Sequence, residues 1–171
     1  MPAELNIPTR LETPKGLRIH IGLFGRRNAG KSSLINALTN QQIAIVSDVP
    51  GTTTDPVEKA CELAPVGPVV FIDTAGIDDV GKLGHLRTDR TMSVLGWMDL
   101  ALIVCDAAGI TDYEKELFRI VTANKTPAIV VLNKTDLHAP DAPVISTTKS
   151  FNLPFVSVSA SEHIGIDTLR S

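Results

Sequence analysis

The sequence predicts an α/β fold: a mostly parallel six-stranded sheet with one antiparallel strand and helices on both faces. Apolar strands alternate with helical segments from Leu17 onward, which is the pattern of β–α–β units. Two of the strands, Leu100–Cys105 and Ala128–Leu132, are continuous apolar runs, as expected for parallel strands buried on both faces. Sheets of this kind bind ligands at the carboxyl ends of their strands, so we expect a functional site there.

Each expected element rests on a local pattern of apolar residues and turn residues. The strands are expected at Leu17–Phe24, Val57–Leu63, Val69–Ile72, Leu100–Cys105, Ala128–Leu132 and Pro154–Val158. The helices are expected at Lys31–Thr39, Gly84–Leu95, Asp112–Asn124 and Ile164–Ser171. A short turn at Pro65–Gly67 makes the second and third strands an antiparallel hairpin.

Length and composition indicate one globular domain. We assign residues 1–16 to an N-terminal tail and residues 17–171 to one domain, whose short final helix suggests truncation. With 43% apolar residues, 20% charged residues and a net charge of -3, the chain gives no reason to expect nucleic acid or a membrane as a partner. Its start lacks a secretory apolar segment, so nothing marks the chain for secretion. We expect the isolated domain to be a monomer or weak dimer. The two cysteines, Cys61 and Cys105, are expected in the core.

The first motif, G-R-R-N-A-G-K-S at Gly25–Ser32, follows a strand and opens a helix. This is the context of a P-loop, in which glycines turn successive backbone N–H groups toward phosphates. Lys31 would supply a positive charge to the β- and γ-phosphates, Ser32 a hydroxyl to Mg²⁺, and Ser33 a contact with the α-phosphate. The nucleotide-binding residues expected here are Gly25, Arg26, Arg27, Asn28, Ala29, Gly30, Lys31, Ser32 and Ser33.

The second motif, D-T-A-G at Asp73–Gly76, ends another buried strand. Its carboxylate, Asp73, would contact Mg²⁺ through water, and the N–H of Gly76 would approach the γ-phosphate. Three consecutive threonines, Thr52–Thr54, lie between the two motifs. One of their hydroxyls should complete the Mg²⁺ shell, and the residues alone leave the choice among the three open.

The third motif, N-K-T-D at Asn133–Asp136, identifies the base. The carboxylate of Asp136 can accept both N1–H and the N2 amine of guanine, whereas adenine would leave it unpaired. Lys134 can lay its aliphatic stem on the base, and Asn133 would tie this loop to the P-loop. Ser159 and Ala160, after the last strand, would offer a backbone N–H to guanine O6. The three motifs together predict a protein that binds GTP and GDP.

In these motifs the chain resembles the translation-factor-related GTPases, a group of P-loop NTPases with a small G domain that includes MnmE, Era, Der and HydF. The resemblance implies that Thr53 is the threonine that binds Mg²⁺ and that Lys31, Thr53 and Gly76 serve catalysis. In the potassium-dependent members, the asparagine that matches Asn28 is a K⁺ ligand. By position, the further K⁺ candidates are Ser47, Val49 and Thr52.

Within this group the resemblance is closest to HydF, the GTPase that matures FeFe-hydrogenase. T-T-T-D-P stands here where MnmE-like and Der-like proteins usually have Thr-Arg-Asp, and Ala44–Ala60 and Gly67–Arg87 both look like HydF. This implies a cytoplasmic GTPase switch domain in H-cluster maturation, with hydrogenase and other maturation proteins as partners. The alternative is an RNA- or ribosome-associated or tRNA-modifying GTPase of the Era, Der or MnmE kind.

The sequence departs from the family pattern in two places. Complete HydF proteins continue into dimerisation and cluster-binding domains, which this sequence does not contain. The glutamine that many GTPases place after D-x-x-G is replaced by Ile77, which cannot orient a water. Asp78, Asp79 and His85 are candidates for that task, against the alternative that they are ordinary solvated residues. We therefore expect slow intrinsic hydrolysis that K⁺ stimulates.

Overall fold

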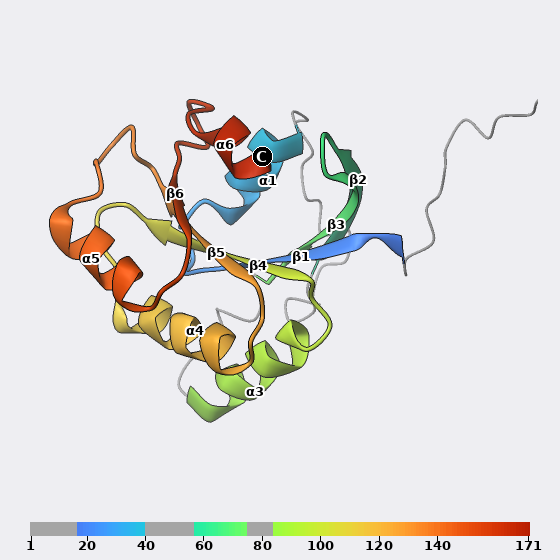
Figure 1. The fold of residues 1–171 in the computed structure, drawn as a ribbon, viewed down its shortest axis with the longest axis horizontal. Coiled ribbons are helices and arrows are strands. Elements are labelled where there is room, and N and C mark those ends of the chain that lie inside the picture. Colours follow the sequence, from blue (N-terminus) through green and yellow to red (C-terminus); the bar gives the residue numbers. More distant parts are fainter. Residues whose placement is uncertain (1–16, 40–56, 75–83) are drawn as a thin grey trace, which may run out of the picture.

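The computed structural model describes residues 17–39, 57–74 and 84–171 (Figure 1). One six-stranded sheet forms the centre of the molecule, in the order β2-β3-β1-β4-β5-β6. Its strands are β1 (Ile19–Phe24), β2 (Val57–Leu63), β3 (Gly67–Asp73), β4 (Leu100–Asp106), β5 (Ala128–Asn133) and β6 (Phe155–Ser157). The helices are α1 (Lys31–Thr39), α3 (Gly84–Leu95), α4 (Asp112–Ala123), α5 (Ala142–Ser150) and α6 (Ile166–Arg170).

The strand directions confirm the predicted fold class. β2 pairs antiparallel with β3, and every other neighbouring pair in the sheet is parallel. The parallel pairs are joined through helices, whereas the antiparallel pair needs only the short turn between Leu63 and Gly67. The predicted strand bounds differ from the observed ones by at most two residues at either end.

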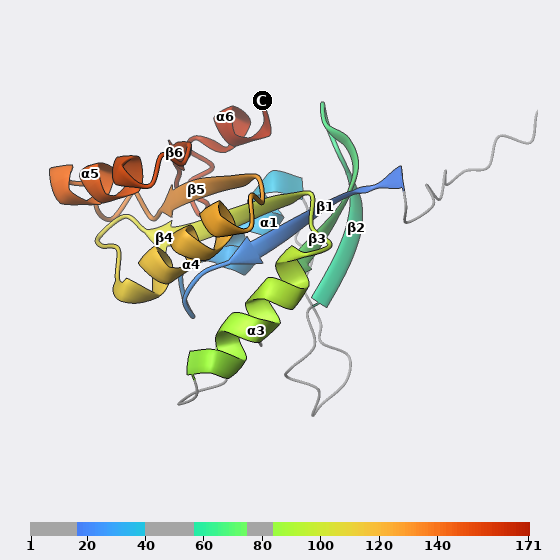
Figure 2. The ribbon, with the colours of Figure 1, turned by 60° about the horizontal axis from the view of Figure 1, so that its bottom comes forward.

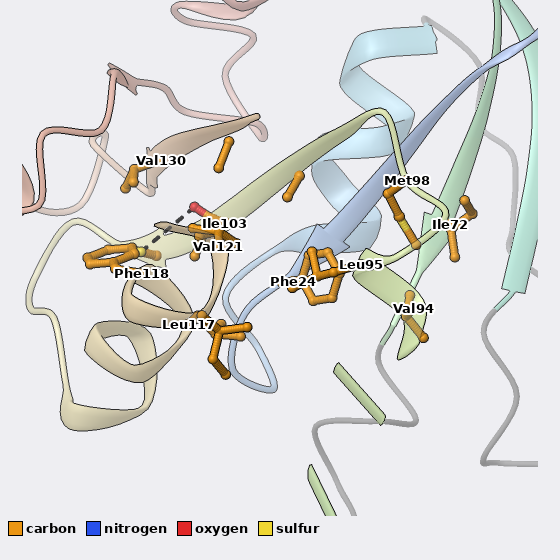
Figure 3. Close-up of a cluster of buried hydrophobic side chains, with 14 of the residues drawn as sticks. Phe24, Ile72, Val94, Leu95, Met98, Ile103, Leu117, Phe118, Val121 and Val130 are labelled. Carbon is orange, nitrogen blue, oxygen red and sulfur yellow. Dashed lines mark hydrogen bonds between the residues drawn. The ribbon is translucent and has the colours of Figure 1, made fainter. Parts of the chain in front are cut away.

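Helices cover both faces of the sheet, as predicted. Figures 1 and 2 show α1 and α6 on one side of the sheet and α3 and α4 on the other. Two buried clusters correspond to these layers. The first contains Leu34, Ile35 and Ile166 from α1 and α6. The second contains Leu95, Phe118 and Val144 from α3, α4 and α5. Figure 3 shows part of this cluster, with Leu95 and Phe118 labelled.

The central strand β4 contributes to both clusters, which explains its continuous apolar run. Ile103 and Cys105 belong to the cluster under α3 and α4, while Leu102 and Val104 belong to the cluster under α1. Alternate side chains of a strand point to opposite faces, so a sheet covered on both sides requires apolar residues at every position. Cys105 is fully buried, as expected, whereas Cys61 is only partly buried; both are free thiols.

The helix α5 is a feature that the sequence reasoning missed. Its sequence, APVISTTKS, is rich in β-branched residues and contains a proline, both of which lower helix propensity. Asp141 nevertheless caps it by accepting a hydrogen bond from the N–H of Val144 at 3.0 Å, and Pro143 lies in the first turn, where proline is tolerated. The predicted final helix is also shorter than expected, because it begins only after Gly165, at a φ of 74°.

The topology brings the ends of four parallel strands to one edge of the sheet. Residues Leu23 and Asp73 are paired in register, as are Asp106 and Asn133. The loop after β1, the end of β3, the end of β4 and the loop after β5 therefore lie along the same edge. No helix in the described part of the chain is long and apolar enough to cross a membrane.

Candidate nucleotide-binding site

The loop between β1 and α1 follows a path that requires glycine at two positions. Gly25 has a φ of 149°, and a Cβ there would lie 2.3 Å from the carbonyl oxygen of Val104. Gly30 has a φ of 97°, and a Cβ there would lie 2.3 Å from Nδ2 of Asn133. Asn28, between them, also has a positive φ, of 65°. These turns shape the loop so that it can present backbone N–H groups to an anion.

Lys31 is buried at the start of α1, although its side chain carries a charge. It is only 6% exposed, and its Nζ donates hydrogen bonds to the carbonyl oxygens of Gly25 and, at 3.0 Å, Arg26. The ammonium is thus held over the loop, beside the positive end of a helix whose first N–H groups lack intrahelical partners. A buried cation and a helix N-terminus at one place suit a phosphate group.

A hydroxyl and a carboxylate meet next to this loop. Ser32 Oγ donates to Asp73 Oδ2 at 3.3 Å, and Asp73 is 6% exposed. The following residue, Thr74, fixes the end of β3 by donating from its hydroxyl to the carbonyl of Leu23 at 2.5 Å. Oxygen ligands of this kind suit Mg²⁺.

Ser32 and Asp73 are not part of a larger cluster of metal-ligating side chains in the described ranges. Within residues 17–39, 57–74 and 84–171, no group of three or more His, Cys, Asp or Glu residues could hold a metal ion. A Mg²⁺ ion at Ser32 and Asp73 would complete its shell with phosphate, water or other oxygen ligands.

Asn133 joins three loops of the site. It is 2% exposed, and its Nδ2 donates to the carbonyl of Ala29 at 3.0 Å. Its Oδ1 accepts from the N–H of Ala160 at 3.1 Å. One side-chain amide thereby connects the loops after β1, β5 and β6. The sequence predicts the connection from the loop after β5 to the P-loop, but not the one to the loop after β6.

The carboxylate of Asp136 is oriented by the neighbouring loop. Ser159 Oγ donates to Asp136 Oδ1 at 2.7 Å and also accepts from the N–H of Glu162 at 3.2 Å. Asp136 itself is exposed, so its carboxylate can reach a ligand. The backbone N–H groups of Ser159 and Ala160 bond to the carbonyl of Ile164 and to Asn133, respectively. A contact from them to guanine O6 would require a shared or exchanged hydrogen bond.

Lys134 is held in place by an acidic residue that the sequence reasoning did not identify. Its backbone has a φ of 66°, and its Nζ lies 3.3 Å from Asp106 Oδ2. Burial raises the pKa of Asp106, but the N–H of Ala108, at 2.9 Å from Oδ1, and the charge of Lys134 lower it more, so the net shift is downward. The signal in the sequence is an acidic residue at the carboxyl end of a buried strand, on the same edge as the three motifs.

The side chain of Arg26, in the first motif, contacts α4. The side chain of Arg26 donates through Nε to the buried carboxylate of Glu114, a second residue that the sequence reasoning missed as part of the site. Arg27, Asn28 and Ser33 are exposed.

The other candidates lie outside the residues that the structure describes: Ser47, Val49, Thr52, Thr53, Gly76, Ile77, Asp78 and Asp79. His85 lies in α3, and its role remains a prediction.

Comparison with known proteins identifies the family. A sequence profile of the family described as 50S ribosome-binding GTPase matches residues 20–134. Among curated proteins, GTPase Der of Wolinella succinogenes is 36% identical over 93% of this chain and 35% of its own length. The tRNA modification GTPase MnmE of Chloroflexus aurantiacus is 42% identical over 86% of this chain and 32% of its own length. The chain thus spans about a third of the length of the curated relatives it matches.

A solved structure supports the fold. Era of Aquifex aeolicus bound to GDP and AlF4- matches with a TM-score of 0.67 and 28% identity, over 88% of this chain and 54% of that chain. Another Era structure, with the same TM-score and identity, contains MgGDPNP and nucleotides of 16S ribosomal RNA. The expectation that nucleic acid is not a partner therefore finds no support in these neighbours.

These relatives distinguish between the two subgroups that the sequence resembles, HydF on the one hand and Era, Der and MnmE on the other. The alternative of a protein of the Der, MnmE or Era kind is supported better than HydF, for which these relatives offer no support. The match to the family profile covers the P-loop, the D-T-A-G motif and the start of the guanine-reading motif. The chain belongs to the family of P-loop GTPases described as 50S ribosome-binding GTPases.

Proposed function

We propose that this chain binds GTP and GDP at the edge of the sheet described above and hydrolyses GTP to GDP and phosphate. The observation that carries the proposal is the side-chain amide of Asn133, which connects the lysine-bearing phosphate loop to the loops of Asp136 and Ser159. A phosphate-binding end and a base-reading end are thereby held in one site.

The proposal gives each end a distinct chemical task. Lys31 and the first N–H groups of α1 bind the β- and γ-phosphates, and Ser33 contacts the α-phosphate. Asp136 accepts from N1–H and N2 of guanine, and the stem of Lys134 lies along the base. Ser32 and Asp73 fit Mg²⁺ and would hold it together with Thr53; when bound, this ion neutralises charge on the phosphates.

Hydrolysis in this proposal is an attack by water on the γ-phosphorus. A bond forms between the water oxygen and phosphorus, the bond to the β–γ bridging oxygen breaks, and the proton of water passes to the phosphate product. Lys31 and backbone N–H groups, among them that of Gly76, stabilise the charge. Since Ile77 cannot orient the water, we expect a slow intrinsic rate. K⁺ bound at Asn28, with help from Ser47, Val49 and Thr52, would raise this rate.

The exchange of Asp136 for asparagine tests the assignment of the base. Asp136→Asn should weaken GTP binding and create binding of xanthosine triphosphate, because xanthine has an oxo group where guanine has an amine. Titration of the protein with fluorescent derivatives of both nucleotides measures the two Kd values. Asp112→Asn, at an exposed carboxylate in the first turn of α4, is the matched control and should leave both unchanged. Unchanged GTP affinity in Asp136→Asn would refute the guanine site.

For the biological role we propose a nucleotide-dependent switch of the Era, Der or MnmE kind, acting in the cytoplasm on RNA, ribosomes or tRNA. The support is the identity to Der and MnmE and the structural match to Era. The second candidate is a switch in hydrogenase maturation, favoured by the T-T-T-D-P segment at Thr52–Pro56. A further alternative to both is a binding module in which nucleotide occupancy suffices and hydrolysis is incidental.

Two experiments separate these roles. RNA binding by the native full-length protein, measured at rising salt concentration, should weaken steeply with salt if the first candidate is right. If it binds no RNA or ribosomes and the gene encodes cysteine and histidine cluster ligands beyond Ser171, the second candidate is right. Partner release with GTP, compared with a non-hydrolysable analogue, shows whether hydrolysis is needed; equal release would favour the binding module.

A further inference from the structure

Glu114 is a fully buried carboxylate in the first turn of α4, with an exposed fraction of 0%. One of its oxygens, Oε2, accepts from the N–H of Thr111 at 2.8 Å and from the hydroxyl of the same residue. These bonds cap the N-terminus of α4. The other oxygen, Oε1, accepts from Nε of Arg26. Arg26 lies in the P-loop between β1 and α1, which is also called the phosphate loop.

A buried carboxylate requires a compensating charge, and here the phosphate loop supplies it. In the part of the chain that the structure describes, Arg26 is the only cation paired with Glu114. The two residues are 88 positions apart in the sequence, so the pair fixes a tertiary contact between the loop and α4. Only the carboxylate is fully buried, since the Arg26 side chain is 40% exposed. Removing Arg26 would therefore leave a buried, uncompensated charge on Glu114, which proteins tolerate poorly.

The backbone of Arg26 has a second task inside the loop. Its carbonyl oxygen accepts from Lys31 Nζ at 3.0 Å and from the N–H of Ala29 at 3.1 Å. The residue that closes the turn and holds the lysine is therefore also the residue whose side chain is anchored on α4. A movement of the Arg26 backbone would shift the carbonyl that positions the Lys31 ammonium.

We propose that Arg26 and Glu114 form a positioning pair, which holds the phosphate loop against α4 in the conformation that binds phosphate. This inference rests on the proposed function and adds to it a determinant of nucleotide affinity, Glu114, that lies outside the three motifs. Without the pair, the loop samples other conformations, and the apparent Kd rises as the binding-competent fraction falls. Both GDP and GTP bind through this loop, so the two affinities fall together, while discrimination of the base is unchanged.

The decisive variant is Glu114→Gln, because glutamine can still cap the helix as a capping-box residue but carries no charge for Arg26. We expect the Kd values for GDP and GTP to rise by a common factor of about ten, as for a competent fraction that falls to about one tenth. Fluorescent-nucleotide titration gives both Kd values, and kcat at saturating GTP should stay within about twofold, since bound nucleotide restores the loop. Glu116→Gln, on the same helix but with an exposed ion pair to Arg119, is the matched control and should change neither Kd.

A double variant separates positioning from stability. Arg26→Gln alone leaves the buried carboxylate of Glu114 without its cation and should lower the melting temperature, whereas the double variant with Glu114→Gln removes both charges and should restore it toward that of the wild type. The nucleotide affinities should stay as weak as in Glu114→Gln, because the anchor is still missing. Recovery of both properties together would overturn the inference and leave the pair a purely structural role.

Two other outcomes would also contradict the inference. Kd values within twofold of the wild type in Glu114→Gln would show that the loop does not depend on the pair, whatever happens to the melting temperature. A loss confined to GTP would show that the pair acts at the γ-phosphate rather than on the loop. If the wild type binds neither GDP nor GTP, the proposed function fails, and the inference fails with it; wild-type binding with unaffected variants removes the inference alone.

Discussion

Replacement of Asn133 by alanine tests how the site is held together. The side-chain amide serves two buried backbone groups, the carbonyl of Ala29 at 3.0 Å and the N–H of Ala160 at 3.1 Å. Alanine leaves both without these partners, and an unsatisfied buried backbone group costs about 1–3 kcal/mol. We therefore expect Asn133→Ala to lower the free energy of unfolding by about 2–6 kcal/mol. At about 2–4 °C per kcal/mol, the melting temperature falls by about 4–24 °C.

The loss should appear in nucleotide binding as well as in stability. Urea unfolding followed by circular dichroism measures the free energy of unfolding, and titration with fluorescent GDP measures nucleotide binding. Asn124→Ala is the control, because Asn124 Nδ2 donates to Thr126 Oγ1 at an exposed position, where water can replace the bond. A change below about 0.5 kcal/mol in Asn133→Ala, the range of an ordinary surface substitution, would show that the bonds of Asn133 do not hold the three loops together.

The structure supports three further predictions. Gly30→Ala should cost about 1–3 kcal/mol of strain and weaken GDP binding, because its Cβ would lie 2.3 Å from Asn133 Nδ2 at a φ of 97°; unchanged GDP affinity would contradict this. The pKa of Asp106 is lowered in the folded state. The ionised carboxylate therefore adds to the free energy of unfolding above the unfolded pKa of about 3.9, and this contribution is lost as pH falls through the folded-state pKa. The stability difference between wild type and Asp106→Asn should therefore be constant from about pH 7 to pH 5 and shrink below about pH 4 in acid-titrated urea unfolding; a difference that does not depend on pH would refute it. Steady-state GTP hydrolysis should be faster in K⁺ than in Na⁺ at equal ionic strength, and Asn28→Ala should abolish the difference; equal wild-type rates would remove K⁺ from the mechanism.

The fold could be predicted from the sequence because its elements follow local rules. β4 is apolar at every position since both of its faces are buried, and the P-loop glycines mark the passage from β1 to α1. The antiparallel β2–β3 pair follows from a connection that is too short for a parallel crossover. α5 escaped prediction because its β-branched residues and Pro143 hide a helix that depends on the Asp141 cap.

The motifs of the site were predictable for a different reason. Asp73 is the last residue of β3, and Lys31 and Asp136 lie beyond the ends of β1 and β5; the carboxyl ends of parallel strands meet at one edge of a sheet. The partners of these residues were not predictable, since a motif does not specify side-chain contacts across the fold. Asp106 beside Lys134 is one example: the two are brought together only by the register of β4 and β5.

The position of α1 shows why such partners matter. At its N-terminus, Lys31 is held by carbonyls of the phosphate loop, and that loop is in turn anchored by the pair of Arg26 and Glu114. At its C-terminus, the last carbonyls lack intrahelical partners, and the guanidinium of Arg170 donates to Leu38 O at 2.6 Å. This charge also suits the negative end of the helix. A tilt of α1 would break contacts at one of its ends, so the geometry of the phosphate site depends on residues of α4 and α6 that lie outside all three motifs.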